Sequence, residues 1–161
     1  MNLKQTSKRR IFVIDILSLL FCIWQSSGLI DVWDAHPHMK GGFLAFIIWL
    51  TPLGFYWSYP SLYTKEPSRL LLIAGVMVTT IGMLGSLNAL RYLGLALAFI
   101  GMTPLSWVHL FWLISAFSWM SAMAYFLRFL TPQEVWAIRM VLSTSGAALT
   151  SLYFYYLLRS K

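Results

Sequence analysis

The chain is short of charged residues. Asp, Glu, Lys and Arg make up only 11% of its 161 residues, against about 25% in soluble globular proteins. Hydrophobic residues make up 59%, and the mean hydropathy is +0.71. This balance excludes an ordinary soluble domain and indicates a chain embedded in a membrane.

Cysteine is almost absent. The single cysteine, Cys22, lies inside an apolar run, so neither an intramolecular disulfide nor a cysteine-based metal cluster can form. Its apolar neighbours Phe21 and Ile23 keep a thiol protonated and unreactive.

Motifs of self-contained enzymes are missing too. The sequence has no Walker-type glycine loop, no H-E-x-x-H, no G-x-S-x-G and no intramembrane carboxylate pair. No segment carries a periodic row of charges of the kind that lines a channel or a transport path. We therefore expect no catalytic residue, no cofactor and no bound metal, and we do not expect an enzyme.

The net charge of +7 comes from twelve basic and five acidic residues. The basic residues are scattered singly at the ends of apolar segments rather than gathered on one face, which argues against a nucleic-acid partner. They are typical of topology signals and of contacts with lipid head groups.

Apolar segments of membrane length are what the sequence has in quantity. At about 1.5 Å of rise per residue, crossing a hydrocarbon core of about 30 Å takes about 20 residues. Six segments come near this length, so the sequence predicts an all-α integral membrane helical bundle that forms a single transmembrane domain over residues 1–161. The predicted spans are 11–30, 42–59, 70–87, 89–103, 105–127 and 133–158.

Both ends of this series carry local signals. The first apolar run follows Lys8, Arg9 and Arg10 as in a signal peptide, but it is longer than the usual about 7 to 15 residues and no A-x-A-like site follows, so we expect a retained span. At the other end, Thr131, Pro132 and Glu134 supply an N-cap, a first-turn proline and a capping-box acid, which predicts a helix start.

The distribution of basic residues predicts the orientation. With a cytoplasmic N-terminus, eight basic residues lie inside and four outside, which favours cytoplasmic N- and C-termini in a bacterial inner membrane. The inside set is Lys4, Lys8, Arg9, Arg10, Lys65, Arg69, Arg159 and Lys161, and the outside set is Lys40, Arg91, Arg128 and Arg139.

The densest polar chemistry lies in the external segment from Asp31 to Gly42. Asp31, Asp34, His36 and His38 offer ligands for zinc, copper or nickel, but their spacing matches no standard metal motif. A solvated loop, or one docked on the bundle, is the favoured interpretation. A metal site and a proton-sensing histidine pair are the alternatives.

Asp15 lies about five residues inside the first span, where an unpaired charge costs about 2.5–3.5 kcal/mol. We expect it to reach the interface or to pair with Arg9 or Arg10, and a place on a transport path is the alternative.

Three further polar residues are candidates for function. Asn88 and Arg91 flank a tight hairpin turn, where they would cap a helix or bind an anionic head group, whereas His109 is expected to be a hydrogen-bonded structural residue. Small residues such as Gly82, Gly94 and Gly101 are expected to let helices of one bundle approach closely, with a dimerisation face as the alternative.

The order of features from Trp33 to Tyr156 resembles the N-terminal part of the exosortase and archaeosortase family of multi-pass membrane transpeptidases. The similar stretches are the entry into an apolar helix at His38 to Gly42, the run 90–97 and the run 111–114. The family's catalytic Cys, Arg and His lie on later helices, and this chain has no cysteine after Cys22. The resemblance therefore implies a relative without catalysis that pairs with a complete sorting enzyme.

The leading hypothesis is thus an accessory or scaffold subunit of a membrane complex, related to protein sorting or export. Its expected partners are the lipid bilayer and either other membrane proteins or further copies of the chain. A small transporter or channel component, with Asp15 on its path, is the first alternative. A metal-binding membrane subunit that uses the segment from Asp31 to His38 is the second.

Overall fold

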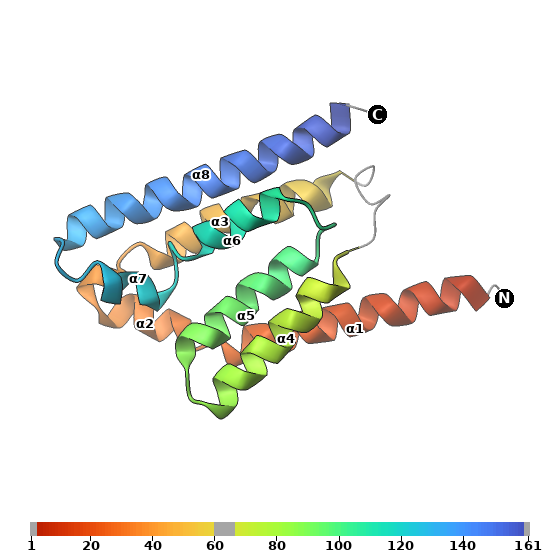
Figure 1. Cartoon of the computed structure of the whole chain (residues 1–161), viewed down its shortest axis with the longest axis horizontal. Coiled ribbons are helices and arrows are strands. Elements are labelled where there is room, and N and C mark those ends of the chain that lie inside the picture. The colour runs from red at the N-terminus through yellow and green to blue at the C-terminus, as the bar shows by residue number, and fades with distance from the viewer. Residues whose placement is uncertain (1–2, 60–66, 160–161) are drawn as a thin grey trace.

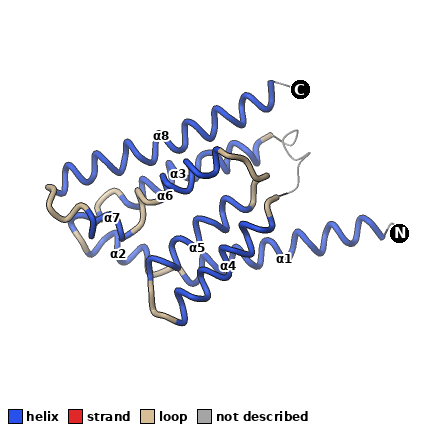
Figure 2. The backbone as a smooth tube through the Cα atoms, viewed as in Figure 1, coloured by secondary structure: helices blue, strands red, loops and turns tan. Residues whose placement is uncertain are grey.

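The computed structural model describes residues 3–59 and 67–159, with side chains from Val13 onward. Every regular element in these two ranges is a helix (Figures 1 and 2). The predicted all-α class is therefore confirmed. The basic side chains of the first ten residues, Lys65 and Lys161 lie outside the described part.

The first half of the chain forms α1 (Leu3–Gln25), α2 (Leu29–Ala35), the short 3-10 helix η1 (Pro37–Met39) and α3 (Gly42–Ser58). The segment from Asp31 to Gly42, expected to be a loop, is thus mostly helical. Pro37 separates α2 from η1, because the residue before a proline avoids helical angles, and His36 is accordingly extended at φ −125° and ψ 129°.

The second half forms α4 (Arg69–Leu84), α5 (Asn88–Gly101), α6 (Val108–Ala116), α7 (Ser121–Phe126) and α8 (Pro132–Arg159). The predicted continuous helix over 105–127 is not found, since α6 has 9 residues and α7 has 6. The break falls around Ser118, and the buried Ser118 hydroxyl makes no hydrogen bond there. Met120 is extended there, at φ −74° and ψ 151°.

Within the described ranges, three stretches are long and apolar enough to cross a membrane: Val13–Ala35, Pro37–Ser58 and Pro132–Arg159. Helices α4 and α5 are apolar but shorter. The structure thus supports a membrane protein with three candidate spans, and a bundle of six spans stays a prediction.

The long helices run side by side in two groups (Figure 1). In one group α8 packs against α3 and α6, and in the other α1, α4 and α5 pack together, with α5 and α6 in contact between the groups. Helices α2 and α7 lie at one end, whereas the described N- and C-terminal residues lie at the opposite end (Figure 2).

The core is built on tryptophans. Trp49 Nε1 donates to the Trp112 carbonyl oxygen at 2.8 Å, and Trp112 Nε1 donates back to the Trp49 carbonyl oxygen at 2.9 Å. Trp119 packs edge-on against Trp49, and all three side chains are fully buried. This reciprocal pair fixes α3 against α6.

Small residues bring α4 and α5 together. A Cβ atom added to Gly94 would overlap Thr79 and the Gly75 carbonyl oxygen, and one added to Gly101 would overlap Leu72. The expected close approach within one bundle is therefore confirmed for this helix pair.

Candidate functional site

The segment containing η1 is docked on the start of α8. His38 Nε2 donates to the Leu130 carbonyl oxygen at 3.1 Å, and Trp33 Nε1 on α2 donates to the Trp119 carbonyl oxygen at 2.9 Å. Of the two forms expected for the segment, the structure therefore shows the docked one.

Glycine makes the connection to α3 possible. Gly41 has a φ of +83°, a left-handed conformation that glycine adopts without steric cost. A Cβ atom at this position would also overlap the indole ring of Trp136. The Gly41 backbone therefore packs directly against the side chains of Trp136 and Met140 on α8.

Arg139 joins three segments from inside the bundle. Its side chain is fully buried. One terminal nitrogen donates to the Ser118 carbonyl oxygen, and the other donates to the His38 carbonyl oxygen at 3.3 Å and to Met39 Sδ at 3.1 Å. The break between α6 and α7 supplies the Ser118 carbonyl, because that oxygen is free of helical bonding.

The guanidinium of Arg139 has neutral acceptors only. Across residues 3–59 and 67–159 no carboxylate pairs with it, and its Nε makes no hydrogen bond. Burying an ion costs several kcal/mol unless it is well compensated. The burial of this guanidinium is therefore costly for the free energy of folding. It was expected among the outside basic residues, and which side of a membrane it occupies stays a prediction; the structure shows that its side chain lies in the interior of the bundle.

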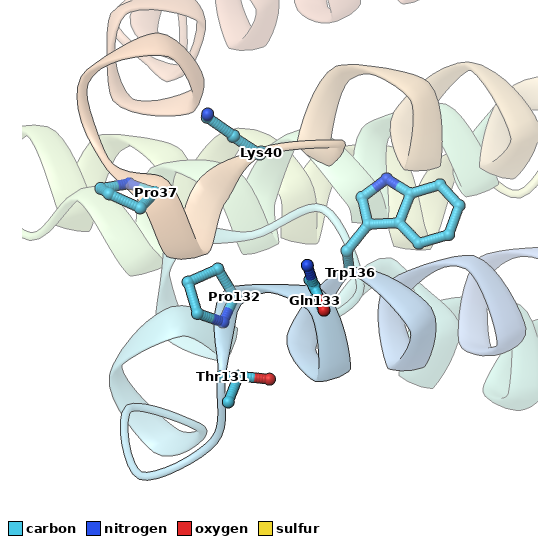
Figure 3. Close-up of a pocket in the computed structure, with 6 residues that line it drawn as sticks. All are labelled: Pro37, Lys40, Thr131, Pro132, Gln133 and Trp136. Carbon is cyan, nitrogen blue, oxygen red and sulfur yellow. The ribbon is translucent and has the colours of Figure 1, made fainter.

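A cavity of about 640 Å³ opens between η1 and the first turn of α8 (Figure 3). Lys40 lies on the η1 side, whereas Gln133 and Trp136 project from α8 (Figure 3). Pro37 and Pro132 complete the apolar wall together with Trp136, and Thr131 adds a hydroxyl.

The start of α8 is capped as predicted. The Thr131 backbone N–H and hydroxyl donate to Glu134 Oε2 at 2.8 and 2.9 Å, and the Glu134 N–H donates to Thr131 Oγ1 at 3.3 Å. The carboxylate beside the cavity is therefore engaged with its own helix cap.

The four metal candidates do not gather. Asp31, Asp34 and His36 are exposed and His38 is half-buried. The rings of the two histidines lie 5.7 Å apart, and Nε2 of His38 is occupied by its hydrogen bond. In the described ranges, no three His, Cys, Asp or Glu side chains are placed to hold one ion.

Asp15 is buried, with 6% of its surface exposed. Its electrostatic partner is Arg69, the first residue of α4. The expected partners Arg9 and Arg10 have side chains outside the described part. The interaction with Arg69 links two helices 54 positions apart in sequence, which a reading of local charges does not find.

The hairpin residues have structural surroundings. Asn88 is the first residue of α5, and its side chain is exposed and makes no cap hydrogen bond. Arg91 Nε donates to the Gly82 carbonyl oxygen at 3.4 Å, and its own carbonyl oxygen accepts from Ser26 Oγ at 3.2 Å. Arg91 thereby ties the α4–α5 hairpin to the turn after α1.

His109 is a buried, hydrogen-bonded residue, as expected. The Ser106 backbone N–H donates to Nδ1 at 2.8 Å, so the neutral ring carries its proton on Nε2. Nε2 then donates to Thr103 Oγ1 at 2.7 Å, and that hydroxyl donates to the Ile100 carbonyl oxygen. The chain of bonds fixes the loop between α5 and α6.

Arg139 is the residue that reasoning from sequence missed. It stands in the apolar run Ala137 to Leu142, and an ionisable residue inside a predicted span is itself a signal of a special role. The same rule that selected Asp15 selects it.

Comparisons of the chain with protein-family models, with curated proteins and with solved structures found no match.

Proposed function

We propose that the chain is a multi-pass membrane protein without a catalytic centre of its own, which serves as an accessory or scaffold subunit of a membrane complex. The observation that carries this proposal is the division between its surface and its interior. Large apolar side chains cover the outward faces of the long helices, including those of Leu17, Trp24, Ile73, Val141 and Leu152. Buried polar side chains are bonded mainly to backbone atoms of the same bundle.

Helix α8 offers the longest outward face. Its 28 residues are covered by α3 and α6 on one side, whereas Val141, Leu149, Leu152 and Tyr156 are exposed on the other. In a bilayer such a face contacts lipid or another helix. Small residues favour helix contacts there, and Ala148 is exposed on α8.

The orientation proposed is with both termini in the cytoplasm of a bacterial inner membrane. Lys40, Arg91 and Arg128 belong to the end with α2 and α7, and Arg69 and Arg159 to the end with the termini (Figure 1). With Arg139 inside the bundle, eight basic residues of the sequence stand against three, a stronger asymmetry in the direction that the positive-inside rule requires.

The complex that would best fit this subunit is one for protein sorting or export, which the resemblance to exosortases supports. The proposal is tested by co-purification from the native membrane in mild detergent. We expect a stoichiometric membrane-protein partner, identified by mass spectrometry. A clean monomer that transports a solute in proteoliposomes would reject the proposal.

Two matched variants locate the contact. Ala148→Trp adds bulk to the outward face of α8, and Met77→Trp does the same on α4, where Met77 is 60% exposed. We expect Ala148→Trp to release the partner and Met77→Trp to retain it. Retention by both variants would exclude the α8 face as the contact.

A further inference from the structure

The cavity beside η1 lies where two candidate spans begin. The apolar stretches Pro37–Ser58 and Pro132–Arg159 both start with a proline that lines it. Any bilayer that accommodates these two stretches therefore has its boundary with water at the level of the cavity. Trp136 lines the cavity as well, and tryptophan is enriched at this depth of a membrane.

Two of the polar side chains that line the cavity have donor groups without a partner. In the part of the chain that the structure describes, the amine of Lys40 and the side-chain amide of Gln133 make no hydrogen bond or ion pair. A lysine amine has three donors and no acceptor. The nearest acid on α8, Glu134, already accepts two hydrogen bonds from Thr131.

The remaining wall is apolar apart from the Thr131 hydroxyl. Pro37, Pro132 and the ring of Trp136 line one volume with Lys40 and Gln133 (Figure 3). A ligand that fits such a site carries negative charge and several acceptor oxygens at one end and an apolar portion next to it. An anionic phospholipid at the membrane boundary has this arrangement.

We propose that this cavity binds the phosphate-bearing head group of an anionic phospholipid. Lys40 supplies the charge and donates to phosphate oxygens, and the Gln133 amide donates a further hydrogen bond. The ring of Trp136 packs against the glycerol and the upper part of an acyl chain. The site belongs to the isolated chain in a membrane, so it stands whether or not the chain has a protein partner.

The test is native mass spectrometry of the purified full chain titrated with phosphatidylglycerol or with phosphatidylcholine of the same acyl chains. We expect the protein to prefer phosphatidylglycerol and Lys40→Gln to weaken its binding about fivefold, since one basic residue near a charged lipid surface contributes about that factor. Arg128→Gln is the matched control, because it removes one exposed charge from the same end of the bundle without lining this cavity.

A second arm separates lipid from soluble phosphate. Binding of glycerol phosphate that Lys40→Gln weakens would support the phosphate site and identify a soluble ligand. Equal weakening by Lys40→Gln and Arg128→Gln, or no preference for phosphatidylglycerol, would overturn the proposal. Unfolding temperatures of both variants in the same detergent verify that the variants are folded. Lys40 is exposed, so its replacement is not expected to lower the stability of the fold.

Discussion

At the scale of single residues, the interior of this bundle is held by side chains that reach backbone carbonyls on distant segments. Trp33, Trp49 and Arg139 each donate to a carbonyl oxygen more than 20 positions away. In a bilayer every polar backbone group needs a partner inside the protein. A break in a helix, such as the one at Ser118, is therefore tolerated where another side chain satisfies the freed carbonyl.

Arg139→Lys tests this role. A lysine keeps the charge but lacks the planar fork that bonds to Ser118 and His38 in two directions, so one buried carbonyl loses its donor. We expect a loss of about 1–3 kcal/mol in the free energy of unfolding, measured by denaturation in detergent.

Arg159→Lys is the control for this substitution, because Arg159 is exposed and lies over the ring of Tyr155. We expect its stability to equal that of the wild type. If the two variants were equally stable, Arg139 would not hold the three segments together.

Trp49→Phe tests the reciprocal tryptophan pair. The substitution removes the Nε1 donor to the Trp112 carbonyl and leaves that acceptor buried, and we expect a cost of about 1–3 kcal/mol. Trp24→Phe is the comparison, since Trp24 is 73% exposed and its replacement should change the unfolding midpoint little. Equal midpoints for the two variants would contradict this role of the pair.

At the scale of elements, helix bounds follow the sequence where a local signal exists. The capping box placed the start of α8, and the predicted spans 42–59 and 133–158 agree closely with α3 (Gly42–Ser58) and α8 (Pro132–Arg159). Residues 105–127 have a high average hydropathy and so predict one helix, because an average does not register a break of a few residues.

Gly94→Ala tests the contact between α4 and α5. The added Cβ overlaps Thr79 and the Gly75 backbone, so the helices must separate, at a cost of about 1–3 kcal/mol. Gly54→Ala is the same chemical change in α3 at a position where nothing lies within 4 Å. There alanine is expected to stabilise the helix by about 0.5–1 kcal/mol. The same sign for both variants in denaturant melts would refute the close contact.

At the scale of the whole molecule, the informative feature is that the chain returns to the end of the bundle where α3 begins before it starts α8. Pro37 and Lys40 line one cavity with residues from the start of α8, namely Thr131, Pro132, Gln133 and Trp136. The two segments therefore lie at the same end, and the chain between them must run the length of the bundle back from the end of α3. Helices α4, α5 and α6 make this return in three passes (Figure 1). Sequence could indicate apolar segments, but this pairing of distant ends depends on tertiary contacts such as those of Arg139.

Cysteine labelling tests this topology in intact cells. In a Cys22→Ala background, Asp34→Cys and Phe129→Cys are expected to react with a membrane-impermeant maleimide from the same, external side, because both positions are exposed at one end of the bundle. Arg159→Cys should react only after the membrane is permeabilised. Labelling of Asp34→Cys and Phe129→Cys from opposite sides would rule out the return.

The position of Arg139 after both of its partners in the chain also has a consequence for biosynthesis. The carbonyl groups of His38 and Ser118 leave the ribosome before Arg139 does, so their partner is missing until α8 has been made. Insertion of α8 is thus the step that locks the earlier helices, and a nascent chain arrested before residue 139 should remain an open substrate for membrane proteases.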